Sequence, residues 1–290
     1  MLELGYNKNL FILPFDHRSS FFKLLNIVDR SPTNDEIDKI KELKGLIYDA
    51  FKKAVSENVP RESAAILVDE QFGGDILKDA FIQGFTTILT TEKSGQKEFT
   101  FEYGDSFSDH LQMHKPTFAK ALIRYKPTDS AESKTKQQQK LKILSDYCHN
   151  NGYKFLLEVL IFESGEVQSE PMRQVIEELQ KVSVEPDVWK MEGMDKESDY
   201  LEVMQQIRKG ERKDVGLVVL GRGGNEQLVE GWIKASAKVN GVIGFAIGRT
   251  IFSNPLLEYQ NGTKTKEQTI DAIKNKFVYF YNVFMNARKG

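Results

Sequence analysis

The feature of this 290-residue sequence that most constrains its fold is a series of short apolar runs separated by helix-like segments. The runs are rich in β-branched and aromatic residues and are almost continuously hydrophobic, which is typical of strands buried on both faces of a parallel sheet. Seven steps lead from the first run to the last over 231 residues, about 33 residues per step, which is the size of one βαβ unit. The expected strands are 10–15, 64–68, 86–89, 118–125, 153–161, 187–191, 215–220 and 241–247.

The segments between these runs carry apolar residues three and four positions apart, which predicts amphipathic helices. The polar stretch 128–142 resembles a linker in composition, but its Ser/Glu start and its apolar continuation predict a capped, solvated helix. Residues 266–287 predict a last amphipathic helix. Eight strands that alternate with helices in one chain of this length predict an α/β fold, a single (β/α)8 TIM-barrel domain over 1–290, rather than an open doubly wound sheet.

Composition narrows the classes of function that such a barrel can have. The 40 basic and 42 acidic side chains give a formal charge of −2, which argues against a nucleic-acid-binding or membrane-surface protein. The single cysteine, Cys148, excludes an internal disulfide framework and a cysteine-based zinc site. Residues 1–5 carry no signal-peptide pattern and no run approaches about 18 apolar residues, so we expect a cytoplasmic protein without a membrane span. The sequence leaves homo-oligomerisation open.

In a barrel of this class the functional site lies at the carboxyl ends of the strands. Every expected strand carries charged residues or glycine there, and most of these residues have side chains that bind anions or move protons. The candidate site residues are Asp16, Arg18, Glu92, Lys93, Lys120, Arg124, Glu158, Lys190, Glu192, Gly221, Arg222, Gly223, Gly248 and Arg249.

Lys190 is the most informative of these residues, because it lies inside an apolar strand. It is two residues from Glu192, so both side chains are expected on the same face. Burial disfavours the charged form of an amine, and imine formation with a ketone requires the neutral form. Lys120 is a second inward-facing candidate that would place a positive charge nearby. The alternative is a structural ion pair between Lys190 and either Glu158 or Glu192.

Glu158 is a lone carboxylate in an apolar strand and needs a partner when it is buried. It could move protons between the intermediates of an imine-forming reaction, or it could simply be the counter-ion of Lys190 or Lys120. Asp16, at the end of the first strand, has the same two interpretations.

The last two strands end in glycine–arginine sequences, 221–224 and 248–249. Exposed backbone N–H groups, helix N-termini and a cation are the components with which barrels bind phosphate at this position. Their occurrence in both of the last two βα loops predicts a phosphate-binding site.

Metal binding has weaker support in the sequence. His110 and His114 are four residues apart, but no third histidine or cysteine lies nearby to complete a site. We therefore expect neither a metal nor an organic cofactor. Asp69, Glu70 and Glu92 remain an open alternative as oxygen ligands of Mg²⁺.

Several stretches, taken in order, carry a family resemblance that runs through all eight expected strands. The chain resembles the class I aldolases of the tagatose-bisphosphate aldolase type. It is more similar still to the aldolase-like C-terminal domain fused to the kinase domain of bacterial 5-dehydro-2-deoxygluconokinases. The stretches are Phe15-Asp16-His17-Arg18, Ile66-Leu67-Val68-Asp69-Glu70-Gln71-Phe72-Gly73, Glu92-Lys93-Ser94-Gly95, Phe101-Glu102-Tyr103-Gly104, Leu122-Ile123-Arg124-Tyr125, Glu185-Pro186-Asp187-Val188-Trp189-Lys190-Met191-Glu192-Gly193, Leu220-Gly221-Arg222-Gly223 and Gly244-Phe245-Ala246-Ile247-Gly248-Arg249-Thr250.

This resemblance implies specific roles for five residues. Lys190 resembles the Schiff-base lysine of strand six, and Lys120 resembles the second lysine, on strand four. Glu158 resembles the proton shuttle and Asp16 the acid that holds the substrate. Arg249 resembles the phosphate ligand of the last loop.

Two departures from the aldolase pattern concern the substrate more than the chemistry. His17 stands where the sugar-bisphosphate aldolases more often have Gln, and 221–224 is Gly-Arg-Gly-Gly instead of a small-residue turn. The extra Arg222 suggests a more anionic substrate.

The leading hypothesis is a metal-independent class I aldolase that cleaves a phosphorylated keto sugar or sugar acid and releases dihydroxyacetone phosphate. The substrate would be a small molecule such as 5-dehydro-2-deoxyphosphogluconate or a ketose bisphosphate. The alternatives are a sugar-phosphate-binding regulator without turnover and a Mg²⁺-dependent barrel lyase or isomerase.

Overall fold

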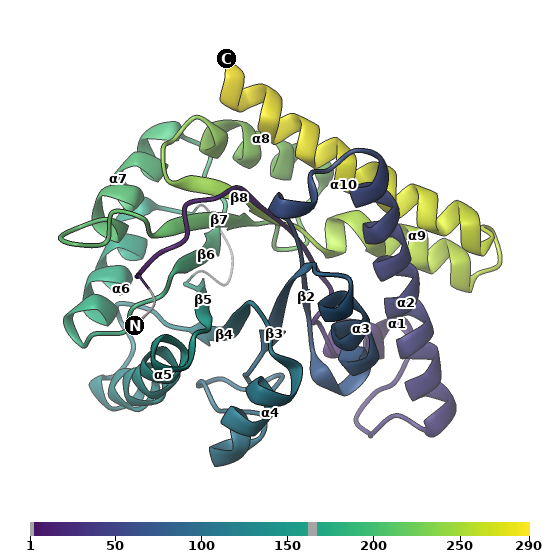
Figure 1. The fold of residues 1–290 in the computed structure, drawn as a ribbon, viewed down its shortest axis with the longest axis horizontal. Coiled ribbons are helices and arrows are strands. Elements are labelled where there is room, and N and C mark those ends of the chain that lie inside the picture. The colour runs from purple at the N-terminus through teal and green to yellow at the C-terminus, as the bar shows by residue number, and fades with distance from the viewer. Residues whose placement is uncertain (1–2, 162–166) are drawn as a thin grey trace.

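Eight parallel strands form one closed barrel surrounded by helices in the computed structural model (Figure 1). The structure describes residues 3–161 and 167–290. Met1 and Leu2, which belong to the segment used to judge a signal peptide, lie outside the described residues. Each strand pairs with the next in chain order, and β1 (Leu10–Pro14) also pairs with β8 (Val242–Ala246), so the sheet closes on itself. The expected (β/α)8 barrel is therefore confirmed.

The strands begin and end within one residue of the apolar runs that predict them. Their buried side chains on both faces explain why the runs are continuous rather than alternating. The remaining strands are β2 Ala64–Val68, β3 Thr86–Thr90, β4 Phe118–Arg124, β5 Lys154–Leu160, β6 Val188–Glu192 and β7 Gly216–Leu220.

At least one α-helix follows every strand, as the βαβ pattern predicts. Two short 3-10 helices, η1 Arg61–Ser63 and η2 Gly104–Ser106, precede β2 and α4. The α-helices are α1 Ser19–Leu24, α2 Asn34–Glu57, α3 Glu70–Ile82, α4 Phe107–His114, α5 Ala131–Asn151, α6 Ser169–Lys181, α7 Glu197–Ile207, α8 Glu226–Ala237, α9 Arg249–Gln260 and α10 Lys266–Lys289.

Local capping signals set the ends of the longest helices. Thr33 and Thr265 begin α2 and α10 with capping boxes, in which the threonine side chain accepts a backbone N–H bond that the helix leaves unsatisfied. At the start of α5 the Ser130 side chain accepts a hydrogen bond from the Ser133 N–H. The C-terminal end of α5 is followed by Gly152, whose φ angle is 83°. The polar stretch 128–142 therefore enters a helix and is not a linker.

Helix α10 packs against α2, α8 and α9 on the outside of the barrel (Figure 1), and its aromatic side chains reach the first and last strands. Phe284 contacts Phe11 of β1 at a ring-centroid distance of 5.3 Å, and Phe277 contacts Phe245 of β8 at 6.0 Å. Phe277 also contacts Phe51 of α2, with centroids 6.2 Å apart. Aromatic pairs of this kind contribute about 0.5–1.5 kcal/mol each beyond their burial. The predicted last helix is thus part of the main core.

Apolar and charged side chains occupy different levels of the barrel interior. A buried apolar cluster fills it, with members such as Ile12, Leu67, Phe118, Leu156 and Val188. Farther along the same strands, toward their carboxyl ends, the inward side chains become charged. None of the described helices combines the length and the apolar stretch needed to cross a membrane.

Candidate active site

A cavity of about 240 Å³ opens at the carboxyl ends of the strands. Its wall is built by residues from β1, β4, β5 and β6 and by the segments after β1, β3, β7 and β8. Most of the residues predicted from the sequence line it. They are Asp16, Arg18, Glu92, Lys93, Lys120, Arg124, Glu158, Lys190, Gly221, Arg222, Gly223, Gly248 and Arg249.

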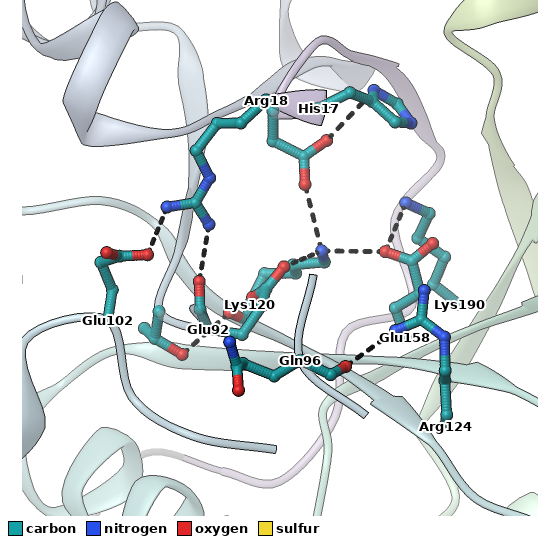
Figure 2. Close-up of polar contacts among 11 residues, drawn as sticks. His17, Arg18, Glu92, Gln96, Glu102, Lys120, Arg124, Glu158 and Lys190 are labelled. Carbon is teal, nitrogen blue, oxygen red and sulfur yellow. Dashed lines mark hydrogen bonds and ion pairs between the residues drawn. The ribbon is translucent and has the colours of Figure 1, made fainter. Parts of the chain in front are cut away.

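Lys120 lies at the centre of an ion cluster with three carboxylates (Figure 2). Its Nζ is 2.5 Å from Glu92 Oε1, 2.9 Å from Glu158 Oε2 and 3.0 Å from Asp16 Oδ2. Burial alone would lower the pKa of this ammonium, but the three carboxylates outweigh it and hold the pKa of Lys120 well above its usual value. Lys120 is therefore a fixed cation at neutral pH.

Lys190 has a different environment, although it is nearly as buried. The register of the sheet pairs Glu158 of β5 with Lys190 of β6, and Lys190 Nζ lies 2.8 Å from Glu158 Oε2. The same carboxylate oxygen therefore contacts both lysines (Figure 2). Burial raises the pKa of Glu158, but the positive charges of Lys120 and Lys190 outweigh this and lower it overall. Glu158 is thus an ionised base in direct contact with the Lys190 amine.

The other two carboxylates around Lys120 differ in their protonation. Burial pushes the pKa of Asp16 upward, but the Lys120 charge and other nearby positive groups hold it well below the ordinary value. Burial raises the pKa of Glu92, and within the described part of the chain its Oε2 has no hydrogen-bond partner. Glu92 is therefore the carboxyl group of this cluster that accepts a proton most easily.

His17 also lines the cavity, next to Asp16. Its Nδ1 lies 3.7 Å from Asp16 Oδ1, and its ring packs edge-on against Phe252. Burial lowers the pKa of His17 to about 4, so its imidazole is neutral at pH 7. His17 was not among the predicted site residues and stood out in the sequence only as a departure from the aldolase pattern. Its position directly after Asp16, at the end of β1, was the available signal for a site residue.

Arg18 lies on the cavity wall, but its guanidinium already has partners. It forms an ion pair with Glu102 and donates from Nη2 to the backbone oxygen of Glu92 at 2.7 Å (Figure 2). The loop after β1 is thereby tied to the loop after β3. Arg18 lines the cavity, as predicted, and its terminal nitrogens position the loop that carries Glu92; substrate or phosphate binding by Arg18 stays a prediction. Glu102, which holds Arg18, was not among the predicted site residues.

Lys93 and Arg124 are exposed at the rim of the cavity. Arg124 donates from Nη1 to the backbone oxygen of Gln96 at 3.1 Å, which holds it against the loop after β3 (Figure 2). These two cations therefore flank the entrance rather than the buried ion cluster.

The loops after β7 and β8 form one wall of the cavity. Arg222 and Gly223 have positive φ angles of 52° and 74°, and a Cβ atom at Gly223 would lie 3.3 Å from the Arg249 guanidinium carbon. Glycine at this position therefore allows Arg249 to lie against the loop backbone. Helix α9 begins at Arg249 with no side chain capping its N-terminus, so its first N–H groups and a guanidinium occur together. This combination is suited to a phosphate group.

Glu192 does not line the cavity, contrary to its predicted role in substrate binding. It is buried, accepts a hydrogen bond from the Ile161 N–H at 3.0 Å, and lies 2.9 Å from Arg222 Nη1. Arg222 thus has a carboxylate partner within the protein. Arg222 also lines the cavity, and the suggestion that it accompanies a more anionic substrate stays a prediction.

The carboxylates proposed as Mg²⁺ ligands do not meet at one point. Asp69 forms a buried ion pair with Lys44 and caps α3 through the Phe72 N–H. Glu70 contacts His110 Nδ1 at 2.7 Å, and Glu92 lies in the cluster around Lys120. Within residues 3–161 and 167–290, no group of three or more His, Cys, Asp or Glu side chains is arranged to hold a metal ion.

Comparison with solved structures identifies proteins of the same fold. A fructose-bisphosphate aldolase from Plasmodium falciparum has a TM-score of 0.69 at 12% identity, covering 99% of this chain and 93% of that one. An archaeal fructose 1,6-bisphosphate aldolase has a TM-score of 0.60 at 11% identity, covering 97% and 95%. The protein Cgl0159 from Corynebacterium glutamicum also has a TM-score of 0.60, at 15% identity, covering 97% and 88%. At these identities the likeness shows the shared fold.

Comparison with curated proteins gives no match. One family matches residues 5–288, which is nearly the whole chain, and its description is "Uncharacterized protein conserved in bacteria (DUF2090)". The chain therefore belongs to the DUF2090 family.

Proposed function

We propose that this protein is a class I aldolase that forms a Schiff base between Lys190 and the ketone of a phosphorylated keto sugar or sugar acid. One observation carries the proposal: a single carboxylate oxygen of Glu158 contacts both Lys190 and the permanently charged Lys120 on the wall of the cavity. A structural ion pair needs only one lysine. The second lysine keeps Glu158 ionised and leaves the amine of Lys190 with a base beside it.

The two lysines are suited to different roles. Lys120 has three carboxylate partners and a raised pKa, so it cannot easily become the neutral nucleophile. Among the described residues Lys190 has one carboxylate partner, Glu158, and shares it with Lys120. A proton passed from the Lys190 ammonium to Glu158 gives the neutral amine that attacks a ketone. Lys120 then provides a fixed positive charge for a substrate oxygen.

The reaction follows from these positions. The Lys190 amine adds to the ketone carbon, and loss of water, with a proton returned by Glu158, gives an iminium ion. Glu158, ionised again after returning its proton, removes the proton from the hydroxyl group β to the iminium carbon, and the bond between that hydroxyl-bearing carbon and the carbon next to the iminium breaks. The bonding electrons move to the iminium nitrogen and form an enamine, while the hydroxyl carbon leaves as an aldehyde. Protonation of the enamine carbon and hydrolysis release the keto product, proposed to be dihydroxyacetone phosphate, and regenerate Lys190.

The phosphate group would occupy the wall formed by Gly221, Gly223 and Gly248, with Arg249 and the N-terminus of α9 as its partners. The named fructose-bisphosphate aldolases of similar fold support a phosphorylated ketose as the substrate class. The resemblance to the domain fused to 5-dehydro-2-deoxygluconokinases supports 5-dehydro-2-deoxyphosphogluconate as one substrate to test, beside the ketose bisphosphates.

Borohydride trapping tests the Schiff base directly. The protein is incubated with dihydroxyacetone phosphate, reduced with borohydride, digested and mapped by mass spectrometry. We expect an adduct on the peptide that contains Lys190, and none in the Lys190→Met variant. Lys44→Met is a matched control, because Lys44 is an equally buried lysine whose partner, Asp69, lies outside the cavity wall.

The trapping experiment also distinguishes the competing functions. A phosphorylated ketose that binds tightly and yields no adduct on Lys190 would reject the lyase and favour a binding protein without turnover. An adduct that persists in Lys190→Met would assign the nucleophile to another lysine. Turnover that is lost on adding a chelator and restored by Mg²⁺ would support a metal-dependent enzyme.

A further inference from the structure

A second cavity, of about 540 Å³, lies at the opposite end of the barrel from the candidate active site. Its residues come from the loop before β7, the turn between α8 and β8, the start of β8 and the C-terminal end of α10. We call it the basal cleft and define it by Arg208, Lys213, Asp214, Lys238, Gly241 and Arg288. Residues at this end of a barrel usually serve stability, so a charged cavity there needs a separate explanation.

The basal cleft contains four cations and one carboxylate. The carboxylate, Asp214, accepts a hydrogen bond from the side chain of Asn7 at 2.7 Å. Within the described parts of the chain, no carboxylate lies within 4.0 Å of Arg208, Lys213, Lys238 or Arg288. The cleft therefore has an excess of positive charge that the protein does not neutralise by direct contact.

The two arginines are held in place by neutral partners. Arg208 donates from Nε to the Val215 carbonyl at 3.1 Å, and this is its only side-chain hydrogen bond among the described residues. Arg288 donates to the carbonyls of Ala237 and Val242 and to the Asn9 side chain. Both side chains are partly buried, and burial lowers the pKa of both guanidiniums. Both remain charged at neutral pH.

Gly241 contributes to the shape of the basal cleft. Its φ angle is 100°, and a Cβ atom there would lie 2.8 Å from the Arg208 guanidinium carbon. The absence of a side chain lets the guanidinium lie directly over the backbone of the turn. The terminal nitrogens of Arg208 are thereby left available to a ligand rather than to a protein acceptor.

A purely structural role does not explain this arrangement. Arg212, in the same loop, is neutralised by Glu185 through a hydrogen bond of 2.7 Å from Nε. The four cations around this cavity repel one another, and Asp214, the one carboxylate in the lining of the cleft, offsets this in part by attracting Arg208. Leaving Arg208 and Arg288 partly buried without a carboxylate contact costs free energy. A bound anion would remove both costs, and guanidinium groups bind phosphate oxygens through two parallel hydrogen bonds.

We propose that the basal cleft is a second anion-binding site, which takes the phosphate or pyrophosphate group of a small molecule. Arg208 binds the anion through its two terminal nitrogens. Arg288 supplies a second positive charge from the C-terminal end of α10. Lys213 and Lys238, which are exposed at the edge of the cleft, attract the anion from solution. The site is independent of the proposed aldolase reaction, because no residue lines both cavities.

Pyrophosphate is the probe for this site, measured by isothermal titration calorimetry at constant ionic strength. The Arg249→Gln background removes the main cation of the proposed phosphate wall in the active site. In that background we expect pyrophosphate to bind with one equivalent per chain. Arg208→Gln added to it should weaken binding at least 10-fold.

Two further measurements keep the test decisive. Lys213→Ala with Lys238→Ala changes only exposed side chains, so it should preserve the fold and still weaken binding at least 3-fold. Lys234→Ala with Lys264→Ala is the matched control, since both lysines lie outside the basal cleft, and it should leave affinity unchanged. Equal pyrophosphate affinity in the Arg249→Gln protein with and without Arg208→Gln would overturn the proposal. So would an equal loss in the control pair, because it would show unspecific attraction.

Discussion

Replacing Lys120 with methionine removes the one cation that three buried carboxylates share. Methionine has a similar length and no charge, so the change isolates electrostatics from packing. Removing one member of a buried ion pair costs about 3–5 kcal/mol, because the remaining charge is left without compensation. Lys120 contacts Asp16, Glu92 and Glu158 within 3.0 Å, so we expect Lys120→Met to cost about 5 kcal/mol at pH 7. That is a large part of the 5–15 kcal/mol typical of a folded domain.

The cost should depend on pH in a defined direction. In the wild type, Lys120 holds the pKa of Asp16 and Glu158 low, so the stability they provide is present at pH 5 and above and is lost at lower pH. Without Lys120, burial raises the pKa values of the carboxylates above those of the unfolded chain. The variant then gains stability as the pH falls and the folded state takes up protons. The difference between the two proteins should therefore be smaller at pH 5 than at pH 7.

Urea unfolding at both pH values measures this difference. Lys44→Met is the matched control, because Lys44 is equally buried but pairs with one carboxylate, Asp69. We expect the control to cost about 3 kcal/mol, at the lower end of the range. A loss below about 1 kcal/mol for Lys120→Met, or an equal loss at the two pH values, would refute the electrostatic explanation.

Three further predictions concern the cavity wall. Burial holds the pKa of His17 at about 4, below its unfolded value near 6.5, so the stability from its neutral form is complete above pH 6.5 and is lost as the pH falls toward 4. His17→Gln should flatten the decrease in Tm between pH 7 and pH 5, and identical slopes would contradict this. Arg249→Ala should weaken binding of a phosphorylated ketose about 10- to 100-fold, or about 1.4–2.8 kcal/mol, and calorimetry should show no such loss for the unphosphorylated sugar. Gly223→Ala should cost about 1 kcal/mol because φ is 74°, whereas Gly231→Ala, in the open middle of α8, should stabilise the protein by a similar amount in the same urea assay.

The pairing of Lys190 with Glu158 shows what a strand pattern can predict and what it cannot. Side chains alternate along a strand, so a charge within an apolar run could be predicted to face the barrel interior. The choice between Glu158 and Glu192 as the partner of Lys190 could not be predicted. It depends on the register between β5 and β6, which places Glu158 beside Lys190 and leaves Glu192 to Arg222.

Arg18 illustrates the opposite case. Its position after β1 correctly predicts a place on the cavity wall, yet its terminal nitrogens are held by Glu102 and by the backbone of residue 92. These partners lie 84 and 74 positions away in the chain. Contacts between two loops that meet only when the barrel closes cannot be predicted from a local sequence pattern.

Local sequence patterns predict the barrel, its strand limits to within one residue, and the charged layer at the carboxyl ends of the strands. These follow from local hydrophobic periodicity, which is set by burial on each face of a strand or helix. Which of these charges contact one another depends on the three-dimensional fold. The fold places three carboxylates around Lys120 and makes Glu158 common to two lysines, and it leaves the cations of the basal cleft without a direct carboxylate partner in the part of the chain that the structure describes. The physical reason is that electrostatic contacts depend on distances of a few ångströms between distant segments, and those distances are fixed by sheet register and loop paths rather than by local pattern.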